Sequence, residues 1–198
     1  MFDARADAYG HGLALVAPVL RDGGRRVLVS TEADAATARL HGLEVLVARR
    51  APADVADAAA AFGLDGAHRP VLALQGELIA VKHVPAGAGV SYGYTHRTPA
   101  ATTLGLVGLG YADGIPRLGS NRAQLSIDGV RYALVGRIAM DQLVIDLDGA
   151  EPPLGTEVVV FGDPVRGEPS AVEWAAWTER SPLALTAGLG HRIRREPR

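Results

Sequence analysis

The stretch Leu125-Ser126-Ile127-Asp128-Gly129-Val130-Arg131-Tyr132 places an Asp-Gly pair between two short strand-like runs. This pattern predicts a β-hairpin with a two-residue turn, because both central residues of such a turn need positive φ. Further strand-like runs, interrupted by Gly and Pro, lie on both sides of it, at residues 71–74, 78–84, 103–109, 143–147 and 157–161. Residues 68–198 are therefore predicted to form a mostly β domain.

The first third of the chain has a different pattern. Short β-rich runs at residues 2–6, 26–30 and 43–48 alternate with Ala-rich helical stretches at residues 11–20, 31–40 and 52–62. Thr31 and Asp34 have the spacing of a capping box, and Pro52 suits a first helical turn. Residues 1–67 are therefore predicted to form three βα units. In the β domain, Ser170 and Glu173 predict one further helix, whose tryptophans Trp174 and Trp177 are expected in the core.

Composition excludes several classes of function. The 198 residues are 48% hydrophobic and 21% charged, which is typical of a soluble globular protein. The chain contains no Cys, which rules out thiolate nucleophiles and Cys-ligated metals. A net charge of −2 provides no field for a nucleic acid, so no nucleic-acid partner is expected. With no long apolar run and no signal-peptide pattern, the chain is expected to be cytoplasmic and without a membrane span.

Two other kinds of site are disfavoured by spacing. The six His residues lack metal-ligand spacing, so no metal site is expected. Gly89-Val90-Ser91-Tyr92-Gly93 matches the pattern of a nucleophile elbow, but the segment after it leads into another strand, whereas an elbow requires a helix. A serine hydrolase is therefore not favoured.

Four segments, in this order, resemble the motifs of the alanine racemase family: Asp7–Gly12, Val90–Gly93, Gly110–Arg117 and Gly136–Gln142. The resemblance implies a (β/α)₈ barrel joined to a C-terminal β domain, with pyridoxal phosphate (PLP) as cofactor. It also implies a head-to-tail homodimer in which the β domain completes the partner's barrel site. The fold expected here is α/β plus β: a truncated, three-unit βα barrel remnant over residues 1–67, joined to an alanine-racemase-like β domain over residues 68–198.

The chain departs from the family pattern in two ways. A complete (β/α)₈ barrel takes about 250 residues, whereas about 67 residues precede the predicted β domain. The position of the family's cofactor lysine is Arg5, and a guanidinium stays protonated and forms no Schiff base. No cofactor is therefore expected. PLP binding through Lys82, the single lysine of the chain, or without a covalent bond remains an alternative.

The resemblance also implies roles for individual residues. Tyr92 corresponds to the family's second base, Tyr9 to a tyrosine near the cofactor phosphate, and His191 to the position just ahead of the closing Arg-rich segment. The expected catalytic residues are Tyr92, Tyr111 and His191. The expected substrate-binding residues are Arg5, Tyr9, Arg117, Arg137, Met140 and Asp141. A structural role also remains open: the loop tyrosines can cap turns, and Met140 can fill core.

Two main functions follow from these observations. The first is a PLP-independent isomerase-type or lyase-type enzyme that transfers a proton on a small carboxylate-bearing substrate whose C–H bond is already acidified. The second is a non-catalytic racemase relative that acts as a binding or partner module. A decayed gene fragment is a third. Because a three-stranded parallel layer leaves open edges, a homodimer is expected. The expected partners are thus a small anionic substrate and a second copy of the chain.

Overall fold

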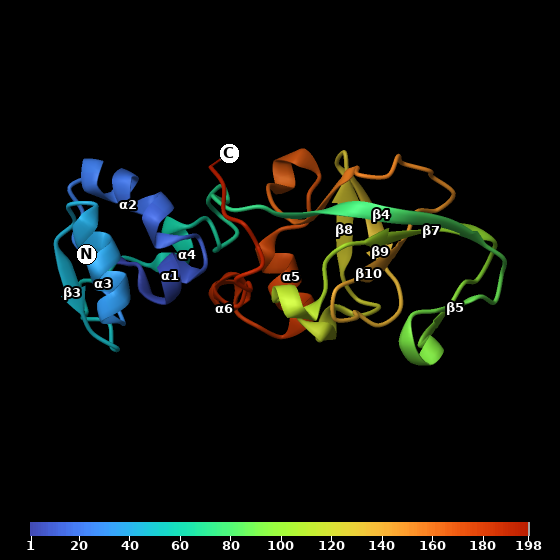
Figure 1. Ribbon diagram of the computed structural model, residues 1–198, viewed down its shortest axis with the longest axis horizontal. Helices are drawn as coiled ribbons and strands as arrows, with labels where there is room; N and C mark the ends of the chain where they lie inside the picture. The colour runs from blue at the N-terminus through green and yellow to red at the C-terminus, as the bar shows by residue number, and fades with distance from the viewer. Residues whose placement is uncertain (198) are drawn as a thin grey trace. The chain divides into compact units, whose positions relative to one another are not determined.

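The computed structural model describes residues 1–197, and Arg198 lies outside the described residues. The chain divides into two compact units. The first, the βα unit, contains residues 1–69 and the chain from Pro182 onward, and the second, the β unit, is Pro70–Ser181 (Figure 1). The sequence boundary at residues 67/68 lies two residues from this division. Residues 182–197, which the sequence pattern placed in the β domain, make their contacts mainly within the βα unit, and the predicted domain bounds stay a prediction.

The sheet of the βα unit is parallel. Strands β1 (Phe2–Asp3), β2 (Val27–Val29) and β3 (Val45–Val47) pair in the order β1-β2-β3. The central strand β2 is fully buried. The helices of this unit are α1 (Arg5–Tyr9), α2 (Leu13–Asp22), α3 (Glu32–Leu40), α4 (Ala58–Ala61) and α6 (Pro182–Ala187). The predicted alternation of strand and helix is therefore present, and its interpretation as a barrel remnant stays a prediction.

Two predicted elements of this unit are shorter than expected. The first strand ends at Asp3, because the chain turns into a left-handed conformation from Ala6 onward. The helix predicted over residues 52–62 is confined to Ala58–Ala61, since the N–H of Ala56 donates to the carbonyl of Met1 and holds that segment beside β1. The cap at Thr31 is confirmed, with its side chain accepting from the N–H of Asp34 at 3.1 Å.

The β unit is built on a closed antiparallel barrel in the order β10-β7-β4-β11-β8-β9. Its strands are β4 (Leu74–Val84), β7 (Thr102–Val107), β8 (Gln124–Ile127), β9 (Val130–Leu134), β10 (Leu143–Asp146) and β11 (Glu157–Phe161). The long β4–β7 pair is visible in Figure 1. The predicted hairpin is confirmed: Ile127 pairs with Val130, and Asp128 and Gly129 have φ of 49° and 79°. Closure leaves this barrel without a free edge.

The predicted helix after the barrel is also present. Helix α5 (Ala171–Thr178) begins with the capping box between Ser170 and Glu173. Trp174 is fully buried, and its indole N–H donates to the carbonyl of Gln124 at 3.1 Å. Trp177 is half-buried and packs edge-on against Trp174, with the ring centroids 6.1 Å apart. No helix within residues 1–197 is long and apolar enough to cross a membrane.

Candidate functional site

Three loops of the β unit contact one another and carry most of the predicted site residues. The first loop lies between β5 (Gly89–Val90) and β6 (His96–Arg97) and contains Tyr92, the second joins β9 to β10, and the third follows β7. The Ser91 hydroxyl donates to the Arg137 carbonyl at 2.5 Å, which joins the first loop to the second. The Tyr111 N–H donates to the Ala139 carbonyl at 3.0 Å, which joins the third loop to the second.

Glycines in these motifs permit the close approach of the loops. A Cβ at Gly110 would overlap the backbone carbonyl of Met140. A Cβ at Gly136 would lie 2.8 Å from the Cβ of Ser91, and Gly136 has a φ of +79°. The absence of a side chain at both positions therefore allows the three loops to pack backbone against backbone.

Tyr92 is presented to solvent on a loop with unusual backbone angles. Its side chain is 69% exposed, and the flanking residues Ser91 and Tyr94 have φ of 57° and 47°. A Cβ at Gly93 would lie 3.5 Å from the guanidinium carbon of Arg137, so this cation borders the residue next to Tyr92. Left-handed non-glycine residues cost free energy and persist where the surroundings fix them. Here the Ser91–Arg137 hydrogen bond is one such constraint.

The predicted residues divide between the two units. Tyr92, Tyr111, Arg117, Arg137, Met140 and Asp141 all lie on the three loops of the β unit and are exposed. The guanidinium of Arg117 lies 5.5 Å from the ring centroid of Tyr111. Met140 is 53% exposed, so it does not fill core. Arg5, Tyr9 and His191 belong to the βα unit, where His191 is exposed after α6.

In the βα unit, the turn after β1 contains a closed side-chain network. The Asp3 carboxylate, on a residue only 4% exposed, accepts from the Arg5 guanidinium through Nε at 2.8 Å and through Nη2 at 2.5 Å. The Tyr9 hydroxyl donates to the same carboxylate at 2.8 Å. The remaining Nη1 of Arg5 donates to the carbonyl of Arg49 at 2.8 Å. Asp3 was not selected from the sequence, although a carboxylate within a predicted strand, two residues before Arg5, was a possible signal.

The network fixes the protonation states of its members. Burial acts to raise the pKa of Asp3, but the hydrogen bonds from Arg5 and Tyr9 outweigh it and hold that pKa below its usual value. Burial, together with the hydrogen bond to Asp3, raises the pKa of Tyr9. The hydrogen bond to Asp3 raises the pKa of Arg5 further. Neither the phenol nor the guanidinium of this turn is therefore suited to accept a proton at neutral pH.

The network borders a hollow of about 530 Å³ in the βα unit. Its lining residues are Arg5, Ala6, Tyr9, Ser30, Thr31 and Arg49. These residues follow the carboxyl ends of the three parallel strands, the edge of such sheets at which ligands bind.

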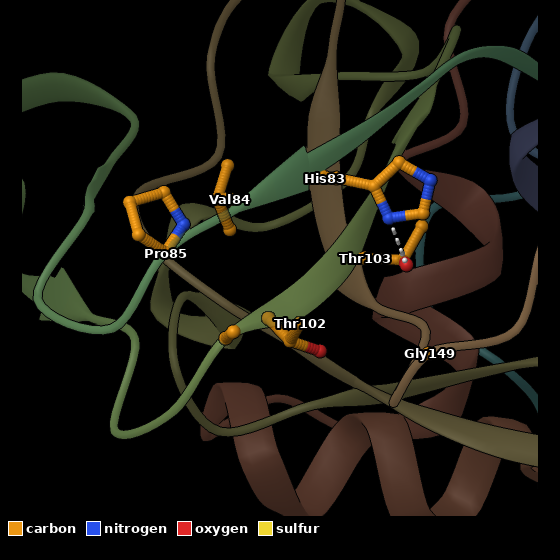
Figure 2. Close-up of a pocket in the computed structure, with 7 residues that line it drawn as sticks. His83, Val84, Pro85, Thr102, Thr103 and Gly149 are labelled. Atoms are coloured by element: carbon orange, nitrogen blue, oxygen red, sulfur yellow. Dashed lines mark hydrogen bonds between the residues drawn. The ribbon is translucent and has the colours of Figure 1, made fainter.

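A second hollow, of about 490 Å³, lies against the barrel of the β unit (Figure 2). His83 lines it and shares a hydrogen bond with the Thr103 hydroxyl at 3.1 Å, while its Nε2 lies 3.3 Å from Glu151. Thr103 is only 1% exposed, so its hydroxyl is not accessible as a nucleophile. Among residues 1–197, no three His, Cys, Asp or Glu side chains are grouped to hold a metal ion.

The family match covers the β unit and also residues 182–197, which follow it in the sequence. The family model described as alanine racemase, C-terminal domain, matches residues 71–197. Alanine racemase of Streptomyces coelicolor is 48% identical over 134 residues, which are 68% of this chain and 33% of that protein. Alanine racemase of Frankia casuarinae is 42% identical over 136 residues, which are 69% of this chain and 34% of that protein. The chain thus spans about a third of the length of the curated relatives it matches.

The structural comparison extends to both units. Alanine racemase of Bartonella henselae, solved with covalently bound pyridoxal phosphate, superimposes with a TM-score of 0.86 at 16% identity. The superposition covers 98% of this chain and 90% of the other, and at this identity it shows a shared fold alone. The family match over residues 71–197 shows that the chain belongs to the alanine racemase family through its C-terminal domain.

Proposed function

We propose that this chain is a racemase relative, non-catalytic by itself, that acts as a partner module, presenting Tyr92 and its neighbouring loops to the barrel of another racemase chain. The observation that carries the proposal is the pairing of Arg5 with Asp3 at the position where the family has its cofactor lysine. Arg5 does not fit covalently bound PLP, because a guanidinium held by a carboxylate forms no Schiff base. Lys82, the single lysine of the chain, is exposed on β4 of the β unit. No chemical step through PLP is assigned to this chain.

The β unit supports a partner role. Exposed side chains of a kind enriched in interfaces gather on its three loops, with Tyr92 at 69%, Tyr94 at 63% and Met140 at 53% exposure. Hydrogen bonds between the loops hold the backbone in place before any partner arrives, which lowers the ordering cost of association. In the family that the chain resembles, this surface completes the partner's barrel site.

Complementation between two chains tests this proposal. The Streptomyces coelicolor racemase is prepared with phenylalanine in place of the tyrosine that corresponds to Tyr92, so that its own second base is absent. Adding this chain is expected to restore alanine racemisation, because Tyr92 is supplied by the second subunit. Tyr92→Phe in this chain should abolish the restoration. Tyr94→Phe, on the same loop and comparably exposed, is the matched control and should leave it intact.

Two results would contradict the proposal. The proposal fails if no racemase activity returns when the two chains are mixed at concentrations well above those used in the activity assay. It also fails if Tyr92→Phe restores activity as well as the unchanged chain does.

The position of Arg137 next to the Tyr92 loop favours a second candidate function. This is a PLP-independent isomerase-type or lyase-type enzyme that acts on a small carboxylate-bearing substrate, with a homodimer as the working form. Tyr92 as phenolate would take a proton from an already acidified C–H, and the phenol would return it to the substrate or to solvent. Proton transfer by a positioned side chain contributes about 10²–10⁴-fold to rate. Tyr92→Phe should therefore slow deuterium exchange into β-keto carboxylates by at least about 10²-fold, and unchanged exchange would exclude this role.

A further inference from the structure

We propose that Asp3 is a built-in carboxylate that closes an oxyanion-binding site formed by Arg5, Tyr9 and Arg49, and that its neutralisation opens the neighbouring hollow to small oxyanions such as inorganic phosphate. The proposal concerns the βα unit, so it does not depend on the partner role of Tyr92.

The geometry around Asp3 is that of a bound ligand anion. Its Oδ1 accepts from the backbone N–H and the Nε of Arg5, at 3.2 and 2.8 Å. Its Oδ2 accepts from the Nη2 of Arg5 at 2.5 Å and from the Tyr9 hydroxyl at 2.8 Å. Two parallel guanidinium donors with an additional hydroxyl are the arrangement by which proteins hold carboxylates and phosphates. A side chain of the protein itself therefore takes the place that a ligand's oxygens would occupy.

The position of Asp3 in the fold makes this carboxylate a strong competitor. Asp3 is the last residue of β1, pairs in register with the buried Leu28, and has a side chain only 6% exposed. Its carboxylate is thus held beside Arg5 by the sheet, without the loss of translational freedom that binding a free anion requires. A free oxyanion is therefore expected to lose the competition for Arg5 and Tyr9.

The guanidinium groups that line the hollow keep it positively charged when the Asp3 side chain is neutral. Arg49 lines it and is exposed, and Ser30 adds a hydroxyl. The acidic residues at the start of the adjacent helix α3 are paired: Glu32 lies 3.4 Å from Arg39, and Asp34 accepts at 2.7 Å from the hydroxyl of Thr31, which lines the hollow. Neutralising Asp3 would leave two guanidinium groups at the hollow, with neither Arg5 nor the Tyr9 hydroxyl held by a negative charge. That set is suited to an oxyanion.

Phosphate titration of an Asp3→Asn variant tests the proposal. Asparagine keeps the shape of aspartate and removes its charge. Isothermal titration with inorganic phosphate, and in parallel with acetate, is made at pH 7.5 and constant ionic strength. The unchanged chain should show no saturable binding at millimolar anion. Asp3→Asn should bind at least one of the two anions at least about tenfold more tightly, in line with the strength of charge-assisted hydrogen bonds. Adding Arg5→Gln to Asp3→Asn should remove the binding.

A matched control separates this site from a general change of charge. Asp22→Asn removes the same charge from an exposed position of the same unit, next to Arg21, and should create no binding. If Asp3→Asn destabilises the unit, a rise in its Tm with added phosphate that exceeds the rise in the Asp3→Asn, Arg5→Gln double variant still reports binding, since a ligand stabilises the state that it binds, whereas phosphate also stabilises proteins without binding. The proposal is overturned if folded Asp3→Asn binds neither anion, if the unchanged chain binds equally well, or if Asp22→Asn gains the same affinity.

Discussion

At Gly110 the lack of a side chain has a direct consequence for stability. A Cβ at this position would overlap the backbone carbonyl of Met140, which cannot move without opening the contact between two loops. Gly110→Ala is therefore expected to lower the free energy of unfolding by about 1–3 kcal/mol, measured by urea denaturation. Gly108→Ala is the control, since its Cβ would lie 3.3 Å from a flexible methyl group of Ile79. Equal effects of the two variants would contradict this explanation.

His11 stacks on Phe62 with the ring centroids 4.0 Å apart. Its Nδ1 lies 2.9 Å from the Ala8 carbonyl, whereas its Nε2 is buried without a hydrogen-bond partner. Burial lowers the pKa of His11 from 6.5, against smaller raising effects from the Ala8 and Tyr9 carbonyls and Asp7. Arg195 lowers it further.

The sign of the resulting pH dependence follows from linkage. Between pH 6.5 and the lower pKa in the folded state, the unfolded chain binds a proton that the folded chain does not. The contribution of His11 to stability is thus present above pH 6.5 and is lost as the pH falls through this window. The Tm of the βα unit should fall from pH 7.5 to 5.5, and His11→Phe should flatten this slope. His41→Asn should keep it, and an unchanged slope in His11→Phe would reject the assignment.

Residues differ in how far the sequence predicts their roles. Tyr92, Arg137 and Tyr111 lie within motifs, and the structure indeed places them on contacting loops. Asp3 lies outside the quoted motifs, and its partnership with Arg5 depends on where β1 ends and on the turn that follows. Local pattern could therefore predict the first group, but not the network that occupies the Arg5 turn.

Helix α5 begins with two reciprocal hydrogen bonds between Ser170 and Glu173. The Ser170 hydroxyl accepts from the N–H of Glu173 at 3.0 Å, and the Glu173 carboxylate accepts from the N–H of Ser170 at 2.7 Å. Ser170→Ala removes one half of this capping box and should cost about 1 kcal/mol, as measured by chemical denaturation. Ser170→Thr keeps a hydroxyl and should recover most of the loss. A similar loss in both variants would show that the cap contributes little.

The turn α1 shows why an element can escape sequence-based prediction. Ala6, Asp7, Ala8 and Tyr9 all have φ of 52–54°, a conformation that costs non-glycine residues about 1–2 kcal/mol each. Because local propensity disfavours such a turn at non-glycine residues, the β-rich run at residues 2–6 predicted an extended chain through Ala6. What holds the turn is non-local: Arg195, near the end of the chain, donates to the Gly10 carbonyl at 3.0 Å, and α6 packs against α1.

The sequence predicted a βα region followed by a β region, and the chain indeed forms a parallel three-stranded sheet and then a closed β barrel. It did not predict that the chain returns to the βα unit at Pro182. The reason is that α6 packs on α1 and α4, both more than 120 residues earlier in the sequence, with Gly10 against the backbone of Thr186. Hydrophobic periodicity identifies elements, but it does not identify the distant surface on which a short helix packs.

Because each unit has a core of its own, the two are expected to unfold in separate transitions. Both tryptophans, Trp174 and Trp177, belong to the β unit, so fluorescence reports that unit alone, whereas far-UV circular dichroism reports both. Gly110→Ala should lower the urea concentration at the midpoint of the fluorescence transition. His11→Phe should leave this midpoint unchanged and should shift only a component of the circular dichroism curve. If His11→Phe moves the fluorescence midpoint as far as Gly110→Ala does, the chain unfolds as one cooperative body, and the oxyanion and partner sites are energetically coupled rather than independent.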